Sequence, residues 1–408
     1  MVKTKGYDVA VVGGGPAGLI AAYYAARAGG RVLIIDRMRP PGQKIPLSGG
    51  GRCNILPLNP VDPRDYISDS SANTLKKILL SWPLAEVRAF LAGPMGLKLI
   101  DKRKTGKVFP LFGGGEAVRN HILAVVRQRG VQVRTGNAVV DIAPSQRRRV
   151  ILESGEAIVA ERVILATGGM SYPQTGSDGT GFEIARRLGH TVIDPYPALV
   201  SLRGGPPAHH HLAGLSIPVT LSAGIGKSRL DVHGDFLFTH HGYSGPAILN
   251  IAHVAARASG SDEQPTIEVA WSDKTLGEWE EILSPSGKTV RGVLKEVLPD
   301  RLVELLLDEL ALLDANLATL TKGDRKKLIT SLMAYPLPWR RTGGWNEAEV
   351  TGGGVALSEV DPRTLRSMIV PQLYFCGEIL DAFGPIGGTN FLWAFVTGKL
   401  AGEGVASA

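Results

Sequence analysis

The stretch "YDVAVVGGGPAGLIAAYYAARAGGRVLIID", Tyr7–Asp36, decides the fold class of this chain. Tyr7–Val12 is short, apolar and rich in valine, which predicts a buried strand. The glycines and the proline at 13–16 predict a turn, and the alanine-rich run after them predicts a helix. A second apolar run, Arg31–Ile35, predicts another strand that leads to Asp36. The sequence therefore predicts a βαβ unit and an α/β fold with a parallel sheet.

Three glycines in this turn have the spacing of a dinucleotide-binding site. Gly13, Gly15 and Gly18 fit G-x-G-x-x-G directly after a strand. In that motif the first glycine permits a tight turn, the second lets a pyrophosphate approach the backbone, and the third lets the helix pack on the strand. The phosphates lie at the helix N-terminus, where free N–H groups attract anions. Asp36 ends the second strand, where a carboxylate can accept hydrogen bonds from the adenosine ribose.

Later motifs favour FAD over NAD(P) as the bound dinucleotide. "ATGG", Ala166–Gly169, ends a predicted strand, as in flavoproteins where the chain crosses the cofactor again. Gly377 and Glu378 follow another strand, where an acid can hold the ribityl or pyrophosphate region. "GGTN", Gly387–Asn390, opens the last helix, whose N–H groups can face the N1–O2 edge of a flavin. No second complete glycine motif follows a strand, so NAD(P)H is expected only as a transient reductant.

The α/β domain is expected to be discontinuous in sequence. Near Thr191 the pattern changes to short strands separated by proline and glycine. It becomes helical over Leu276–Met333 and returns to glycine-rich strands near Tyr335. We therefore expect a Rossmann-like FAD-binding domain over 1–190, completed by 336–408. Between these segments we expect a β-barrel-like domain over 191–275 and a small helical subdomain over 276–335.

Seven motifs are distributed along the whole chain: "GGGPAG", "SGGGRCN", "VFP", "ATGGMSYPQTGSDGTGF", "LFTHHGYSGPAIL", "VTGGGV" and "LYFCGEILDAFGPIGGTNFLWAF". In order and spacing they resemble the BaiN/RdsA-like family of NAD(P)/FAD-dependent oxidoreductases, also called YhiN-like. The resemblance implies an FAD-binding fold with an inserted β-barrel and helical domain. The chain departs from the family's usual residues at Ile55–Pro57 and at Thr389–Leu392, near the expected flavin, which leaves the substrate open.

The motifs and the resemblance together imply a cofactor site drawn from several segments. The residues assigned to it are Gly13, Gly15, Pro16, Ala17, Gly18, Asp36, Arg37, Lys44, Ser48, Gly49, Gly50, Gly51, Arg52, Cys53, Asn54, Val139, Ala166, Thr167, Gly168, Gly169, Gly377, Glu378, Gly387, Gly388, Thr389, Asn390 and Phe391.

The "SGGGRCN" segment, Ser48–Asn54, resembles the flavin-facing loop of that family. Its glycines let the backbone pass close to a cofactor, and Arg52 can pair with a phosphate or a substrate anion. Cys53 is then placed to reach the flavin or the substrate. A lone cysteine is also often a small buried hydrophobe, so the sequence leaves both a catalytic and a packing role open for Cys53.

The resemblance implies hydride transfer through flavin N5. One substrate class is an activated C=C bond reduced at the expense of NAD(P)H, including uridine in ribosomal RNA. The other is a small molecule such as an enone or an aminoketone. In the reductive scheme Cys53 is the candidate proton donor, because a thiol of ordinary pKa is protonated at neutral pH. A non-catalytic FAD-binding module is the remaining alternative.

Composition limits the class of protein further. A net charge of +7, spread along the chain, permits RNA binding without requiring it. Cys53 and Cys376 are the only cysteines and form no CxxC pair, which favours a reducing compartment. The apolar stretch Val9–Ala26 is interrupted by Gly13–Pro16, so we do not expect it to cross a membrane. We expect a cytoplasmic protein with no stable protein partner.

Other conspicuous residues receive less specific predictions. His209–His211 is expected to be a solvated loop, and no metal site is expected. Tyr172, Tyr243 and Ser244 could line a substrate cleft or complete turns. A leucine stripe is expected to form the core of the helical insert. Its members are Leu302, Leu305, Leu306 and Leu310.

Overall fold

The computed structural model describes the chain apart from residues 1–5, 28, 144–147, 226–227, 260–263 and 408. The chain divides into two compact units. The discontinuous unit consists of Met1–Pro197 and Glu349–Ala408, and the inserted unit is Ala198–Ala348. Each unit has its own cluster of buried apolar side chains.

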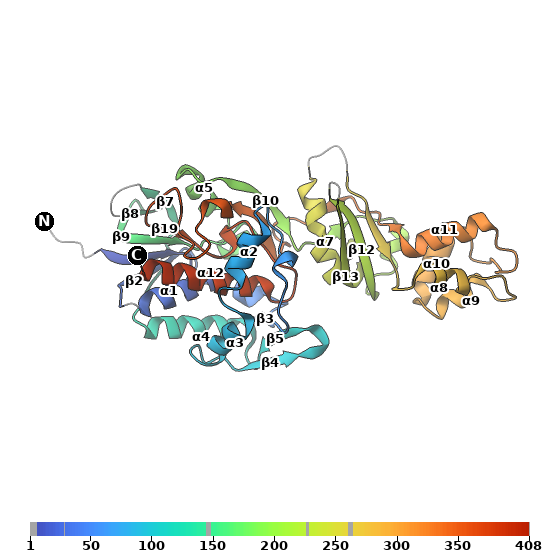
Figure 1. Cartoon of the computed structure of the whole chain (residues 1–408), viewed down its shortest axis with the longest axis horizontal. Helices are drawn as coiled ribbons and strands as arrows, with labels where there is room; N and C mark the ends of the chain where they lie inside the picture. The colour runs from blue at the N-terminus through green and yellow to red at the C-terminus, as the bar shows by residue number, and fades with distance from the viewer. Residues whose placement is uncertain (1–5, 28, 144–147, 226–227, 260–263, 408) are drawn as a thin grey trace. The chain divides into compact units, whose positions relative to one another are not determined.

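A seven-stranded sheet is the centre of the discontinuous unit (Figure 1). Its strands are β1 (Tyr7–Val12), β2 (Val32–Asp36), β6 (Gln132–Thr135), β7 (Val139–Ala143), β8 (Arg148–Leu152), β9 (Ala157–Leu165) and β19 (Leu373–Phe375). Six of them follow the order β6-β2-β1-β9-β8-β7, and β19 also pairs with β9. β1 pairs in parallel with β2 and β9, whereas β8 is antiparallel to both β7 and β9. The predicted βαβ unit and the α/β fold class are confirmed.

The first and last helices of this unit pack side by side (Figure 1). They are α1 (Pro16–Arg27) and α12 (Thr389–Ala406). A Cβ added to Gly398 would lie 2.5 Å from the carbonyl oxygen of Ala17, and one added to Gly402 would lie 2.4 Å from that of Ala21. These separations are shorter than any van der Waals contact, so the close approach of the two helices requires glycine. The C-terminal segment therefore completes the fold that the N-terminal segment begins.

The remaining helices of the discontinuous unit are α2 (Ala72–Leu79), α3 (Leu84–Ala92), α4 (Gly114–Gln128) and α5 (Thr180–Arg187). Short 3-10 turns include η1 (Ile45–Leu47), η3 (Arg103–Thr105) and η6 (Gly377–Ile379). A three-stranded sheet has the order β3-β5-β4, formed by β3 (Leu56–Pro57), β5 (Lys107–Pro110) and β4 (Leu99–Lys102).

A two-stranded sheet lies where the chain leaves and re-enters the discontinuous unit. It joins β10 (Val192–Ala198) to β18 (Val350–Val355). The sequence placed the insertion at 191–335, but the compact inserted unit runs from 198 to 348. Both boundaries move because β10 and β18 pair with each other and so belong with the discontinuous unit.

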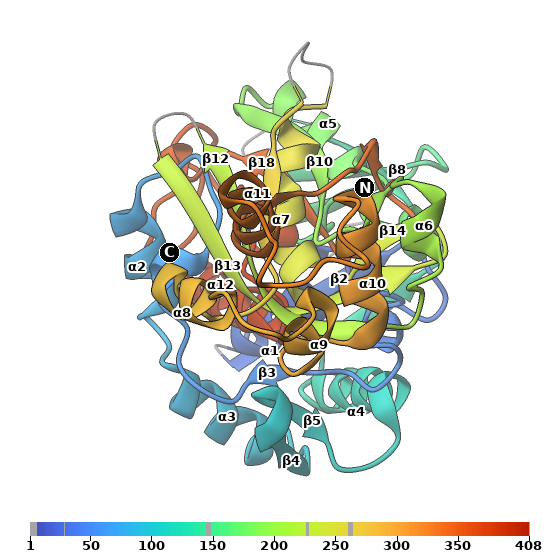
Figure 2. The same ribbon diagram turned by 90° about the vertical axis from the view of Figure 1, so that its right-hand side faces the viewer.

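The inserted unit contains a second seven-stranded sheet, in the order β16-β15-β12-β13-β14-β11-β17. These strands are β11 (Leu202–Arg203), β12 (Ser216–Ile225), β13 (Ser228–Thr239), β14 (Gly242–Ser244), β15 (Ile267–Ala270), β16 (Tyr335–Pro336) and β17 (Arg341–Thr342). Its helices are α6 (Pro207–His210), α7 (Pro246–Arg257), α8 (Leu276–Ile282), α9 (Val290–Lys295), α10 (Asp300–Glu309) and α11 (Lys322–Met333). Figure 2 shows α7 beside β12 and β13, which it contacts. The predicted leucine stripe lies in the core of this unit, with Leu310 partly buried.

The prediction of a solvated loop at the three histidines is wrong for His209. This side chain is 1% exposed and lies in α6. Tyr243 Oη lies 2.8 Å from its Nδ1, and Tyr335 Oη lies 3.0 Å from its Nε2. Glu309 also contacts Nε2, at 3.1 Å. His209 is buried because these three polar groups satisfy both ring nitrogens, and Tyr243 is a core residue whose hydroxyl is bonded.

Within the part of the chain that the structure describes, no helix combines the length and the hydropathy that crossing a bilayer requires.

Candidate functional site

The three motif glycines in the turn between β1 and α1 differ in what surrounds them. Gly13 has φ +104°, and an added Cβ would lie 2.3 Å from the carbonyl oxygen of Ala166. A Cβ on Gly18 would lie 2.0 Å from the Gly13 carbonyl oxygen. A Cβ on Gly15 would meet nothing within 4 Å. Packing within the protein therefore explains Gly13 and Gly18, whereas the space at Gly15 is open in the way that an approaching ligand would need.

Asp36 is tied directly to this turn. Its Oδ2 accepts a hydrogen bond from the Gly14 N–H at 2.6 Å, and its Oδ1 accepts one from the Met38 N–H at 2.7 Å. Burial raises the pKa of the Asp36 carboxyl, against the lowering effect of these two bonds. Each carboxylate oxygen has further lone pairs, so the group can still accept a bond from a ribose hydroxyl. Arg37, in contrast, pairs with Asp178 and donates to Thr180 Oγ1 at 3.2 Å.

Close contacts bring two other predicted segments to the same turn. Ala166 donates its N–H to the Val12 carbonyl at 2.8 Å, so "ATGG" follows β9 beside the Gly13 turn. Gly377 has φ +81°, and an added Cβ would lie 2.7 Å from Ala17 Cβ. The N–H of Gly377 donates to Thr397 Oγ1 of α12 at 2.9 Å. The turn, "ATGG" and "GE" segments therefore form one cluster at the ends of β1, β9 and β19.

Lys44 and Glu378 form the charged part of this cluster. Lys44 Nζ donates to both carboxylate oxygens of Glu378, at 2.7 and 2.9 Å, and contacts Ser171 Oγ. Glu378 Oε1 also accepts bonds from Ser171 Oγ and from the Thr351 N–H, each at 2.9 Å. Both charged side chains are more than three-quarters buried, so the pair is held in a fixed geometry.

The "SGGGRCN" loop has an unusual backbone. Gly49, Gly50 and Gly51 have φ of +57°, +64° and +85°, and Cys53, which has a side chain, has φ +58°. The Cys53 N–H donates to the Ser48 carbonyl at 3.0 Å, which closes the loop. A non-glycine residue in this region costs about 1–2 kcal/mol. Strain of this kind occurs preferentially at functional sites.

The Cys53 side chain is fully buried in the main core of the discontinuous unit. Burial raises the pKa of its thiol to about 11, although a contact with the Ser48 side chain lowers it. The thiol is therefore protonated at neutral pH, as both a packing role and a proton-donor role require. Both cysteines of the chain are free. Asn54 is buried next to Cys53, whereas Arg52 is exposed.

The start of α12 brings together the last group of predicted residues. Gly388 is the N-cap residue, and no side chain caps the helix. The N–H groups of its first turn, at Thr389, Asn390 and Phe391, therefore have no acceptor within the helix. A Cβ added to Gly387 would have one neighbour, Lys107 Cε, at 3.7 Å.

Two further predicted residues also contact other parts of the protein. The Asn390 side-chain amide forms two hydrogen bonds with the Gly384 backbone, each at 2.9 Å. Its backbone N–H is therefore the group that Asn390 can offer to a ligand at the start of α12. Val139 is buried at the start of β7, where it pairs with Leu152 of β8.

Sequence reasoning missed four residues that contribute to the cluster: Ser171, Thr351, Glu349 and Lys107. Thr351 Oγ1 accepts bonds from the N–H groups of Met170 and Ser171, at 2.7 and 3.1 Å. Burial raises the pKa of the Glu349 carboxyl, and the charges of Lys107 and Lys44 oppose this. Ser171 and Thr351 lie within the motifs "ATGGMSYPQTGSDGTGF" and "VTGGGV", which were the available signal.

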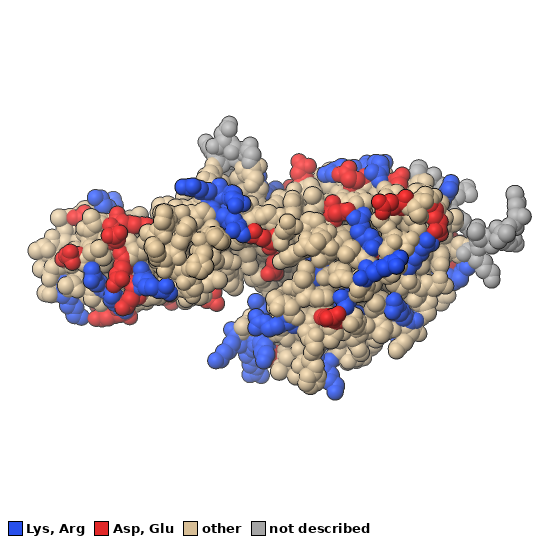
Figure 3. All heavy atoms as spheres, turned by 180° about the vertical axis from the view of Figure 1, so that it is seen from behind, with Lys and Arg blue, Asp and Glu red and all other residues tan. Residues whose placement is uncertain are grey.

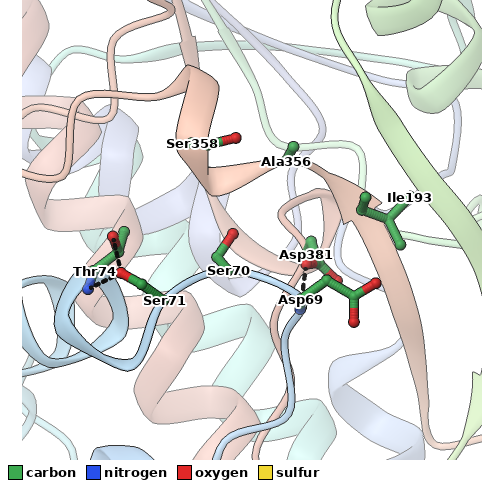
Figure 4. Close-up of a pocket in the computed structure, with 8 residues that line it drawn as sticks. All are labelled: Asp69, Ser70, Ser71, Thr74, Ile193, Ala356, Ser358 and Asp381. Carbon is green, nitrogen blue, oxygen red and sulfur yellow. Dashed lines mark hydrogen bonds between the residues drawn. The ribbon is translucent and has the colours of Figure 1, made fainter.

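A cavity of about 260 Å³ lies elsewhere in the discontinuous unit (Figure 4). Six of its eight lining residues are polar. The Asp69 N–H donates to Asp381 Oδ2 at 2.9 Å, and the Thr74 N–H donates to Ser71 Oγ at 3.3 Å. The lining residues are Asp69, Ser70, Ser71, Thr74, Ile193, Ala356, Ser358 and Asp381. None of them was predicted to bind a cofactor.

Comparison with known proteins gives concordant matches over nearly the whole chain. Residues 7–404 match the family described as "HI0933-like protein Rossmann domain". The chain is 30% identical to "Ribosomal RNA dihydrouridine synthase" of Escherichia coli (strain K12), over 95% of each chain. It is 31% identical to "3-dehydro-bile acid delta(4,6)-reductase" of Clostridium scindens, over 98% of each chain. The resemblance identified from the sequence motifs is thereby confirmed.

A solved structure shares the fold at much lower identity. It is a 3-ketosteroid delta1-dehydrogenase of Sterolibacterium denitrificans, 15% identical, with a TM-score of 0.51, and the alignment covers 98% of this chain and 99% of that one.

Proposed function

Because the chain belongs to the HI0933-like family of Rossmann-domain proteins, we propose that it is an FAD-dependent oxidoreductase that reduces an activated C=C bond. The preferred substrate is uridine in ribosomal RNA, reduced to dihydrouridine. NAD(P)H is the reductant, and the balance is one hydride and one proton added across the double bond, with NAD(P)⁺ released.

The open space at Gly15 is the observation that carries the cofactor assignment. Gly13 and Gly18 are needed by the protein's own packing, but Gly15 is not. Its position at the start of α1, beside Asp36 and the helix dipole, fits a pyrophosphate and an adenosine ribose. The Lys44–Glu378 pair and the "ATGG" turn lie against the same turn, where they would hold the middle of an extended dinucleotide.

When bound, FAD supplies the hydride acceptor and donor at the flavin ring. The chain's own contribution is to orient the ring and to stabilise charge. Uncapped N–H groups at the start of α12 favour a negative charge on a nearby ring edge, as helix N-termini do. The three left-handed glycines of the Ser48–Asn54 loop let the backbone come close to a flat ligand.

Two residues are candidates for the proton donor. Cys53 follows the glycine loop, and its thiol is protonated at neutral pH. Glu349 is partly buried. Burial raises the pKa of its carboxyl, against the opposing charges of Lys107 and Lys44. A general acid contributes about 10²–10⁴-fold to the rate of such a step.

A small-molecule enone is the second candidate substrate. The observation in its favour is the Clostridium scindens relative, which is as similar to this chain as the Escherichia coli one.

The experiment has two parts. Dihydrouridine is measured in ribosomal RNA from cells with and without the gene, and the purified protein is mixed with NADPH while flavin absorbance is followed. We expect one dihydrouridine of the ribosomal RNA to be absent from cells that lack the gene. We also expect NADPH to bleach the bound flavin rapidly. Unchanged ribosomal RNA with a flavin that is reoxidised by an enone would assign the small-molecule substrate instead. Protein purified without flavin, and unable to take it up, would contradict the cofactor assignment.

A further inference from the structure

The hairpin formed by β4 and β5 has two faces that differ in chemistry. Its register pairs Ile100 with Phe109 and Lys102 with Lys107, and places Asp101 opposite Val108. Because side chains alternate between the faces of a strand, Lys98, Ile100 and Lys102 share one face with Lys107 and Phe109. Leu99, Asp101 and Val108 share the other.

The Asp101 face is the inner one. Val108 is buried and pairs with the buried Leu56 of β3. Asp101, the acidic residue of the hairpin, is bonded by Arg88 Nη2 at 2.7 Å. The hairpin's negative charge is therefore neutralised on the inner side.

The opposite face combines cations with aromatic and apolar side chains. Lys98, Lys102, Arg103 and Lys104 are exposed. The Arg52 guanidinium lies 6.0 Å from the centre of the Phe109 ring. Just beyond β5, Leu111 is 42% exposed and Phe112 is 71% exposed. We call this surface the basic hairpin face, defined as Arg52, Lys98, Lys102, Arg103, Lys104, Lys107, Phe109, Leu111 and Phe112. In Figure 3, Lys and Arg side chains gather on the projecting end of the hairpin.

The basic hairpin face borders the candidate site. Lys107 Cε is the atom nearest to the open side of Gly387, at the start of α12. Arg52 belongs to the glycine loop, and the Gly51 carbonyl accepts a bond from the Gly115 N–H at 3.0 Å, directly after Phe112–Gly114. A polymer bound on this face would therefore have one segment close to the place where the reduced base must lie.

We propose that the basic hairpin face binds single-stranded RNA next to the base that is reduced, with Lys102, Arg103 and Lys104 on phosphates and Phe112 stacked on an unpaired base. This inference rests on the proposed RNA substrate. Cations supply the sequence-independent part of such binding through counterion release. An exposed aromatic ring beside them supplies a stacking platform for a base.

The test uses the full-length flavoprotein and a fluorescent single-stranded oligoribonucleotide of mixed sequence, with anisotropy as the readout. Removing three phosphate contacts in Lys102→Ala/Arg103→Ala/Lys104→Ala should weaken binding. It should also lower the slope of log K against log salt by about 2, at about 0.7 for each phosphate on a single strand. Phe112→Ala should weaken binding about 5- to 150-fold and leave the slope unchanged.

A matched variant controls for net charge. Lys322→Ala/Lys326→Ala/Lys327→Ala removes three exposed cations from α11 and should bind the RNA like the wild type. All variants should keep their flavin and their rate of flavin bleaching by NADPH, because the tip of the hairpin is outside the candidate cofactor site.

The outcomes separate this inference from the proposed function. If the wild type binds RNA and forms dihydrouridine but the hairpin variants bind equally well, the docking surface is wrong and the function stands. If the wild type neither binds nor reduces RNA, the proposed substrate is wrong and the inference falls with it. If the hairpin and α11 variants lose equal amounts of RNA affinity, net charge alone explains the effect and the proposed docking surface is wrong. Binding of the wild type to phosphatidylserine vesicles in place of RNA would overturn it as well.

Discussion

Gly15 is the residue at which ligand binding and folding can be separated. Gly15→Val should leave the fold intact, because a Cβ added there meets no protein atom within 4 Å. It should abolish FAD binding, because the same space is required by the pyrophosphate. Flavin content and the melting temperature of the purified variant are the measurements. Gly277→Val is the matched control, since Gly277 also has open space around it and lies in α8, and it should keep its flavin. A Gly15→Val protein that remains fully yellow would contradict the assignment.

The identity of the proton donor is a second question at this scale. Cys53→Ala should retain flavin and its bleaching by NADPH, whereas reoxidation by the C=C substrate should slow by about 10²–10⁴-fold. Stopped-flow absorbance follows the two half-reactions separately. If Cys53→Ala reoxidises normally and Glu349→Gln is slow, the donor is Glu349. Loss of flavin from Cys53→Ala would make the buried thiol a packing residue.

The sequence predicted residues of the site where the signal was local, and missed those that depend on distant contacts. Gly13, Gly15 and Gly18 are recognisable because all three lie within one short motif of fixed spacing. Thr351 is not, because its role is to accept bonds from Met170 and Ser171, far away in the sequence. His209 was misjudged for the same reason, since its partners Tyr243, Tyr335 and Glu309 come from three other elements.

Among the elements, α7 should make the inserted unit sensitive to acid. Its His253 is 3% exposed, and burial, with a smaller effect of Arg257, lowers the pKa of the imidazole to about 4. An unfolded histidine has a pKa of about 6.5, so the unfolded chain binds more protons between these two values. The free energy of unfolding should therefore be undiminished above about pH 6.5 and fall by about 3 kcal/mol as the pH drops to 4.

Urea unfolding of the wild type at pH 7.5 and at pH 5 measures this loss. His253→Leu should reduce the difference between the two pH values, whereas His211→Gln, at an exposed position, should not. An unchanged pH dependence in His253→Leu would assign the acid sensitivity to other groups.

Element boundaries show which local rules are reliable. The chain forms two separate helices at α2 and α3, because Pro83 cannot continue a helix and instead occupies the N-cap of α3. β1 has the predicted bounds, because its apolar run is flanked by glycine on both sides. The pairing of β10 with β18 could not be predicted, because it joins strands on either side of the insertion.

For the molecule as a whole, continuity of the chain predicts which unit folds alone. Residues 198–348 form one uninterrupted segment with its own core, and they should unfold cooperatively when expressed separately. Residues 1–197 lack α12, β18 and β19, so the side of α1 that packs against α12 is exposed in this fragment. These residues should therefore remain unfolded. Circular dichroism during heating measures both. A cooperative transition from the 1–197 fragment would show that α12 is dispensable.

The packing of α12 on α1 also sets an order of events during synthesis. At about 5–20 residues per second, the ribosome makes α12 tens of seconds after α1. The inserted unit can fold in that interval, whereas the side of α1 that packs against α12 stays exposed until α12 has been made. The turn at Gly13–Gly18 is therefore translated long before α12 and is among the last parts to reach its final structure. A nascent chain that stalls just before α12 should carry a folded insertion on a scaffold still open to proteases.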